Sequence, residues 1–135
     1  MEIKKVVVIG SGTMGSGIAA HLCNANIPVT LLDLKTEISE QARDKIHKSR
    51  PPLLLDKSKI NNIKVGNIVD NFDEVKEADW VVEAVVERID IKHDIYEKIF
   101  KDRKKGAIVS SNTSSIPIKV LSQHLSEEEK KDFCI

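Results

Sequence analysis

The sequence is poor in aromatic residues, cysteine and long hydrophobic runs, and it has no net charge. Aromatics make up 4% of its 135 residues, and the two cysteines, Cys23 and Cys134, show neither Cys-x-x-Cys nor metal-ligand spacing. We therefore expect no metal site and a reducing, cytoplasmic location. No apolar run approaches the ~18 residues of a membrane span or forms a signal peptide, so no membrane partner is expected. The balance of 21 basic and 21 acidic residues argues against a protein built to bind nucleic acid.

The length suits a single domain over residues 1–135. Short aliphatic bursts alternate with segments of helical periodicity along the whole chain. Such alternation implies right-handed crossovers and a parallel sheet with helices on both faces. The sequence thus predicts an α/β fold with a doubly wound sheet.

The individual elements follow from periodicity and from turn and capping residues. We expect a helix carrying Ile91, Ile95 and Ile99 that ends near residue 104, and a capping box formed by Ser126 and Glu129. Strands are expected at 3–9, 28–33, 67–70, 79–85, 107–110 and, only just begun, 133–135; helical segments at 14–25, 36–49, 72–77 and 117–124; and irregular chain at 53–66.

A glycine-rich turn directly follows the first strand. Gly10, Gly12 and Gly15 have the spacing Gly-x-Gly-x-x-Gly, and a helix begins immediately after them. Gly10 allows a tight turn, Gly12 lets the backbone approach a pyrophosphate, and Gly15 lets helix and strand pack closely. Backbone N–H groups and the helix dipole then favour an anion at this point. Spacing and context together predict a Rossmann-like dinucleotide site.

An acidic residue stands where such a site holds the adenosine ribose. Asp33 closes the second strand, 18 residues after Gly15. Its carboxylate can accept both ribose hydroxyl protons and would repel a 2′-phosphate, while Leu34 offers no guanidinium to receive one. NAD is therefore favoured over NADP, although the nearby Lys35 keeps NADP as an alternative, and the turn alone also allows a flavin.

Two further clusters follow the later strands, at 83–87 and 111–115, and should border the same crevice. Glu87 is either a solvated acid or part of the site, and the run after residue 110 is either a helix cap or a ligand loop. Lys92 lies on the apolar half of its helix. It either snorkels to solvent or reaches over the crevice rim to a phosphate or ribose.

These segments together resemble the NAD-binding domain of the 3-hydroxyacyl-CoA dehydrogenase family. The resemblance rests on GSGTMGSGIAAHL at 10–22, LLD at 31–33, DWVVEAVVERIDIK at 79–92 and SNTSS at 111–115, and it covers essentially the whole chain. The SRPPLLL stretch at 49–55 is also similar to long bacterial members, in which this domain belongs to a multifunctional fatty-acid oxidation protein. In that family (3S)-hydroxyacyl-CoA is oxidised to 3-oxoacyl-CoA in fatty-acid β-oxidation.

The resemblance implies roles for individual residues. Ser114 corresponds to a substrate-orienting serine near the nicotinamide, and Lys92 would contact the cofactor or coenzyme A. The expected cofactor-binding residues are Gly10, Ser11, Gly12, Thr13, Met14, Gly15, Asp33, Val85, Val86, Glu87, Lys92, Asn112 and Ser114. A basic region with seven lysines and arginines at 43–64 is either a solvated face or, as the family suggests, a seat for the CoA nucleotide.

The resemblance also implies what the 135 residues do not contain. The family's general base is a histidine in a His-Phe-Phe-Asn-Pro stretch, held by a glutamate, and the strand beginning at Phe133 resembles the one that leads to it. The four histidines present, His21, His47, His93 and His124, are not credible replacements. The family's helical C-terminal domain, which usually pairs subunits into dimers, is also absent. We therefore expect cofactor binding with little turnover; the alternative is a non-catalytic NAD-binding or interaction module.

Overall fold

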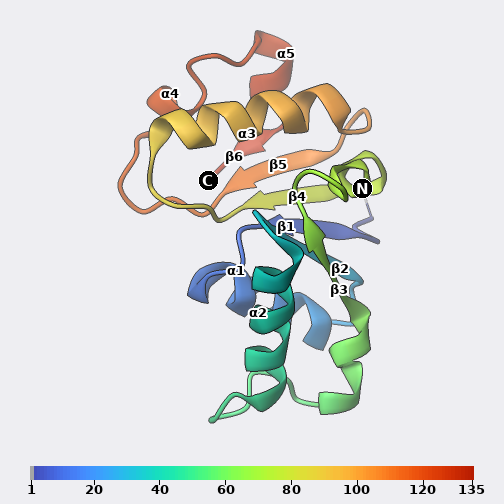
Figure 1. Ribbon diagram of the computed structural model, residues 1–135. Coiled ribbons are helices and arrows are strands. Elements are labelled where there is room, and N and C mark those ends of the chain that lie inside the picture. Colours follow the sequence, from blue (N-terminus) through green and yellow to red (C-terminus); the bar gives the residue numbers. More distant parts are fainter. Residues whose placement is uncertain (1) are drawn as a thin grey trace.

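The computed structural model describes residues 2–135 and contains one parallel sheet flanked by helices (Figure 1). Its six strands lie in the order β3-β2-β1-β4-β5-β6. The chain builds outward from β1 in one direction through β2 and β3, and in the other through β4, β5 and β6. The strand order therefore reverses next to β1, which is where a ligand crevice is expected at the carboxyl ends of the strands.

The central strands are short and almost wholly buried. They are β1 (Val6–Ile9), β2 (Val29–Asp33), β4 (Trp80–Glu83) and β5 (Ile108–Ser111), with β3 (Ile63–Asn67) and β6 (Phe133–Cys134) at the edges. Consecutive side chains of a strand point to opposite faces. Val6 and Val8 accordingly join one hydrophobic cluster, and Val7 and Ile9 join the other.

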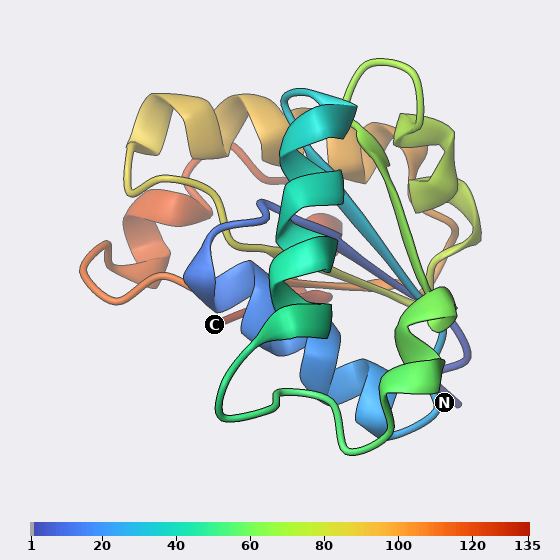
Figure 2. The same cartoon turned by 60° about the horizontal axis from the view of Figure 1, so that its bottom comes forward.

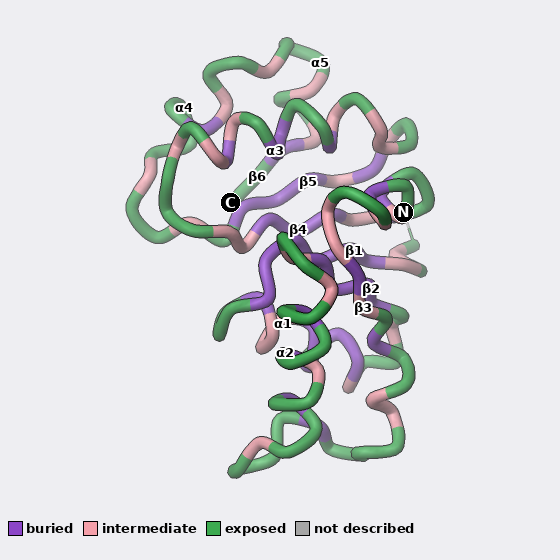
Figure 3. Tube along the Cα trace, in the orientation of Figure 1, coloured by how far each residue is buried: buried purple, intermediate pink, exposed green. Residues whose placement is uncertain are grey.

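Each face of the sheet is covered by its own set of helices (Figures 1 and 2). On one face lie α1 (Thr13–Asn24), α2 (Thr36–Lys48) and the 3₁₀ helix η1 (Lys57–Asn62). On the other lie α3 (Ile89–Asp102), the 3₁₀ helix η2 (Phe72–Glu77), α4 (Ile118–Leu121) and α5 (Glu127–Lys130). The strands and the inner faces of these helices are buried (Figure 3), and their apolar residues form two clusters, one on each face of the sheet.

Most expected elements are found within a few residues of their predicted bounds, and the predicted fold class is confirmed. The predicted capping box is confirmed as well: the N–H of Glu129 donates to the Ser126 hydroxyl, and the Ser126 N–H donates to the Glu129 carboxylate. The first strand begins at Val6, later than the predicted residue 3. The N–H groups of Lys4 and Lys5 donate to the Asp79 carboxylate instead of joining a strand.

The position predicted for the third strand is wrong. It spans 63–67, within the segment expected to be irregular, and not 67–70. Asn67 ends the strand because its side-chain oxygen accepts the N–H groups of Val69 and Asp70, which turns the chain. The rest of the supposedly irregular segment contains η1, whose start is capped by Asp56 through the N–H of Ser58.

None of the helices in residues 2–135 is both long and apolar enough to cross a bilayer.

Candidate cofactor site

The glycine turn joins β1 to α1 in the form that a pyrophosphate site requires. Gly10 has φ = 107°, a conformation that residues with side chains rarely adopt, and its N–H donates to the Leu32 carbonyl (2.8 Å). At the start of α1, Gly12 occupies the N-cap position without any side-chain cap, and the first turn carries no acidic residue. The first N–H groups of a twelve-residue helix are thus left available to an anion.

The three glycines differ in what surrounds them. A Cβ atom on Gly15 would lie 1.8 Å from the Gly10 carbonyl oxygen, so only glycine lets α1 pack this closely on the turn. A Cβ atom on Gly12 would have no atom within 4 Å. The space above Gly12 is open, as the close approach of a ligand to the backbone demands. The space at Gly12 is free for the predicted approach of a pyrophosphate, and that contact stays a prediction.

Asp33 faces the glycine turn from the end of β2. Its Oδ2 atom accepts the N–H of Ser11 (2.8 Å) and also the Ser11 hydroxyl, while Oδ1 accepts the N–H of Leu34 (2.7 Å). The carboxylate is only half-buried. Its Oδ1 atom keeps free acceptor capacity, and the Ser11 hydroxyl can give way to a ligand hydroxyl, so the group fits a ribose diol.

A cavity of about 510 Å³ connects the turn with Asp33. It is lined mainly by apolar side chains from both halves of the sheet, together with the backbone of the turn. Eight of the predicted cofactor residues lie in its wall: Gly10, Ser11, Gly12, Thr13, Met14, Asp33, Val85 and Val86. Gly15, Glu87 and Lys92 do not line it. An elongated anionic nucleotide fits such a groove, with its phosphates at the turn and its ribose at Asp33.

Beside this cavity, a buried carboxylate joins the ends of β4 and β5 to α3. Glu83 closes β4 with no exposed surface. Its Oε2 atom accepts the Val85 N–H (2.9 Å) and the Lys92 ammonium (2.6 Å); its Oε1 atom accepts the Ser111 hydroxyl (2.7 Å) and the Tyr96 hydroxyl. Burial and the adjacent carboxylate raise the pKa of the Tyr96 hydroxyl, which therefore stays protonated as a donor.

Glu87 carries this network to the protein surface beside the cavity, whose wall includes the preceding Val85 and Val86 but not Glu87. The Lys92 Nζ atom lies 3.1 Å from its Oε1 atom. Its Oε2 atom accepts the hydroxyls of Thr113 (2.7 Å) and Ser115 (2.6 Å) and, more weakly, the Ser115 N–H. These hydroxyls, with a further contribution from Lys92, lower the pKa of Glu87 to about 2. Glu87 is thus ionised at neutral pH, and it joins the loop after β4 to the loop after β5.

Lys92 does not lie where it was expected. Its side chain has no exposed surface, so in this conformation the ammonium neither snorkels to solvent nor reaches over the crevice rim to a cofactor or coenzyme A. The reason is the pair of carboxylates, Glu83 and Glu87, which hold the ammonium below the rim. A lysine on the apolar half of a helix was the one sign in the sequence of this network, because a buried cation requires a buried carboxylate. The role of Glu83 itself was not predicted.

The loop after β5 leaves its predicted site residues accessible. Ser114 is exposed between Thr113 and Ser115, both of which are held by Glu87. Asn112 is also exposed, and its N–H donates to the Glu83 carbonyl (2.8 Å). Neither side chain lines the cavity beside the glycine turn. Their contacts with cofactor and substrate stay predictions.

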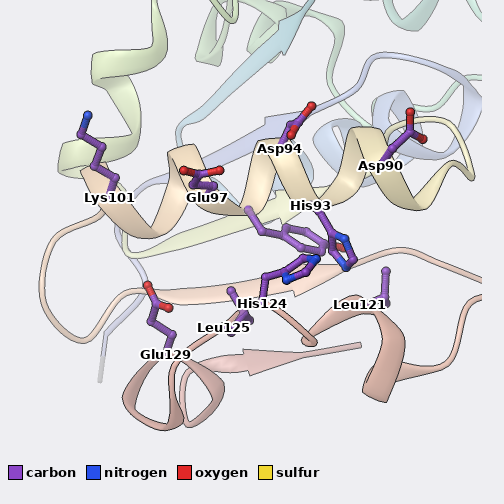
Figure 4. Close-up of a pocket in the computed structure, with 10 residues that line it drawn as sticks. Asp90, His93, Asp94, Glu97, Lys101, Leu121, His124, Leu125 and Glu129 are labelled. Carbon is purple, nitrogen blue, oxygen red and sulfur yellow. The ribbon is translucent and has the colours of Figure 1, made fainter.

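Two of the histidines lie in a different groove, between α3 and the segment 121–129 (Figure 4). The rings of His93 and His124 meet edge to face with centroids 4.4 Å apart, and Nε2 of His93 lies 2.8 Å from the Val120 carbonyl oxygen. No residue lines both this groove and the cofactor cavity. His93 and His124 thus lie apart from the cofactor cavity. None of the seven basic side chains at 43–64 lines the cofactor cavity either.

Comparison with known families identifies the domain. Residues 5–135 match the family model described as the NAD-binding domain of 3-hydroxyacyl-CoA dehydrogenase. The chain belongs to the 3-hydroxyacyl-CoA dehydrogenase family. The cofactor implied by this domain is NAD, which the glycine turn and Asp33 fit.

Relatives of the family share the whole chain but extend well beyond its length. A probable 3-hydroxyacyl-CoA dehydrogenase of Deinococcus radiodurans is 41% identical, over 98% of this chain and 40% of its own length. A putative fatty acid oxidation complex trifunctional enzyme of Rickettsia felis is 42% identical, over 99% of this chain and 20% of its own. The crystal structure of 3-hydroxybutyryl-CoA dehydrogenase from Escherichia coli superposes with a TM-score of 0.82 at 27% identity, over 96% of this chain and 29% of that one.

Proposed function

We propose that these residues bind NAD as the cofactor domain of an enzyme that oxidises (3S)-3-hydroxyacyl-CoA to 3-oxoacyl-CoA in fatty-acid oxidation. The observation that carries the proposal is the pairing of an uncapped helix start at Gly12 with the Asp33 carboxylate across one cavity. Family membership and the names of the relatives support the substrate class. NAD would supply the hydride acceptor, and the protein would position it.

In this proposal the described residues would bind and orient the cofactor. The N–H groups at the start of α1 would hold the pyrophosphate, and Asp33 would accept the adenosine ribose hydroxyls. Because the adenosine lies over β2, the other end of the cofactor would extend over β4 and β5, toward Glu87 and Ser114. In that position Ser114 would orient the substrate hydroxyl, and an acyl-CoA is the expected partner.

The proton-accepting step needs a group that these residues do not supply. A general base must lie within hydrogen-bond reach of the proton it removes. His93 and His124 lie in the separate groove, and the family's His-Phe-Phe-Asn-Pro stretch does not occur in the sequence. We propose that the base, and the helical domain through which subunits pair, belong to residues other than these 135. For this reason an NAD-binding module without catalysis is a second candidate function.

Two assays test what these proposals share, NAD binding and the lack of a base among these residues. The single tryptophan, Trp80, lies in β4, so bound NADH should quench its emission by energy transfer. Saturable quenching supports the NAD site, and its absence over millimolar NADH contradicts it. Turnover of acetoacetyl-CoA with NADH should be undetectable for the 135 residues alone. A rate typical of enzymes, about 1 to 10³ per second, would show that a base is present among them.

A further inference from the structure

The network below the crevice carries an unbalanced charge. Glu83 and Lys92, both without exposed surface, form an ion pair with Nζ and Oε2 2.6 Å apart. Lys92 also contacts Glu87, so the three side chains together bear one net negative charge. The neighbouring Arg88 does not offset it, because its guanidinium pairs with Asp90 (2.9 Å). The excess charge lies on Glu87, the member of the network that reaches the surface.

The strand order decides which end of the cofactor this charge faces. Asp33 lies beyond β2, on one side of β1, and Glu87 lies beyond β4, on the other. With the adenosine ribose at Asp33 and the pyrophosphate at the glycine turn, the nicotinamide must extend toward the ends of β4 and β5. Glu87 holds Thr113 and Ser115 there, so its carboxylate is fixed in place before any ligand arrives.

The nicotinamide ring is the part of NAD whose charge changes in the reaction. The oxidised ring is positively charged, and uptake of a hydride makes it neutral. A fixed anion close to the ring stabilises the oxidised form and does little for the reduced form. Hydrogen bonds from the Thr113 and Ser115 hydroxyls hold this carboxylate in place, so its charge has a fixed position.

We propose that Glu87 sets the relative affinity of this domain for the two redox forms of NAD and favours the oxidised form. The inference rests on the proposed function, because it requires NAD in the crevice. It assigns Glu87 a role in specificity and makes Lys92 its positioning residue. The Lys92 ammonium holds the Glu87 carboxylate in position. The buried Glu83 carboxylate neutralises the charge of Lys92, so the negative charge of Glu87 is not compensated.

The test measures the dissociation constants of NAD⁺ and NADH separately, by calorimetry on the whole 135-residue chain at low ionic strength, for the wild type and Glu87→Gln. The amide keeps the shape of the side chain and removes its charge. We expect the ratio Kd(NADH)/Kd(NAD⁺) to fall roughly three- to tenfold, as one charge a few ångströms from the ring predicts. Glu87→Asp should retain most of the wild-type ratio.

Glu97→Gln is the matched control, because Glu97 is an exposed acid of α3 that lines the separate groove. It removes the same charge and should leave the ratio unchanged. A ratio that stays constant in Glu87→Gln, or equal weakening of both redox forms, would overturn the inference while leaving the NAD site intact. Failure of the wild type to bind either form would instead refute the proposed function itself.

Discussion

The ammonium of Lys92 lies 2.6 Å from the Glu83 carboxylate, and neither side chain has any exposed surface. This pair connects α3 to the end of β4, and through Ser111 and Glu87 to the end of β5. A buried ion pair is a weak source of net stability, because desolvation offsets the attraction. Its effect here is to fix the two loops that would enclose the nicotinamide end of the cofactor.

Removing one member of this pair should destabilise the fold strongly. We expect Lys92→Met to lower the free energy of unfolding by about 3–5 kcal/mol, because it leaves the buried Glu83 carboxylate without a counter-charge. The double variant Glu83→Gln/Lys92→Met should recover much of that loss. Urea denaturation followed by circular dichroism measures both variants and the single variant Glu83→Gln. If the double variant is as unstable as the sum of the two single changes, the residues do not act as a pair.

The glycines of the turn should separate folding from binding. Gly15→Ala should disrupt packing and lower the melting temperature, since its Cβ would meet the Gly10 carbonyl at 1.8 Å. Gly12→Ala should fold normally, because its Cβ meets no atom within 4 Å, yet it should weaken NAD binding by standing in the way of the pyrophosphate. Gly17→Ala has equally open surroundings and is the control. Unchanged NAD affinity in Gly12→Ala would contradict the pyrophosphate site.

Asp33→Ala tests the ribose contact. Loss of hydrogen bonds to a charged acceptor should weaken NAD binding on the order of 10- to 100-fold and narrow the preference for NAD over NADP. Calorimetry with both cofactors measures the effect. Asp44→Ala, an exposed position on α2, should have none. An unchanged dissociation constant for NAD in Asp33→Ala would contradict the proposed contact between Asp33 and the ribose.

Glu87 should also contribute to the dependence of stability on pH. Its pKa falls from an ordinary value of 4.5 to about 2 in the folded chain, chiefly through the hydroxyls of Ser115 and Thr113. A lowered folded pKa stabilises the fold above the unfolded pKa, and this contribution is lost as the pH falls toward 2. The difference in unfolding free energy between wild type and Glu87→Gln should therefore shrink from pH 5 to pH 2. A difference that is constant over this range would contradict the lowered pKa.

The sequence was sufficient for the features that depend on local pattern. Three local patterns predicted the sheet, the turn and the cofactor: the β-branched run before Gly10, the glycine spacing and Asp33. Each could be used because its role follows from the local backbone conformation. The capping box at Ser126 could be predicted from the sequence for the same reason. These local patterns agree with one another along the chain, and for this reason the fold class could be predicted from the sequence.

The features that depend on contacts between distant residues could not be predicted from the sequence. Strand β3 was misplaced because its end is set by the side chain of Asn67, and its residues 63–66 carry only a weak strand pattern. The position of Lys92 depends on Glu83, nine residues earlier, and on Tyr96 and Ser111, which meet only after α3 packs on the sheet. Periodicity identified Lys92 as unusual but could not identify its partners.

The central claim is that NAD binds between the start of α1 and Asp33, and direct calorimetric titration of the chain with NAD⁺ tests it most simply. The account predicts saturable binding of one NAD⁺ per chain, weakened by Asp33→Ala and by Gly12→Ala while both variants keep the wild-type circular dichroism spectrum. The absence of binding heat at every tested temperature in a correctly folded chain, together with no quenching of Trp80 by NADH, would contradict it.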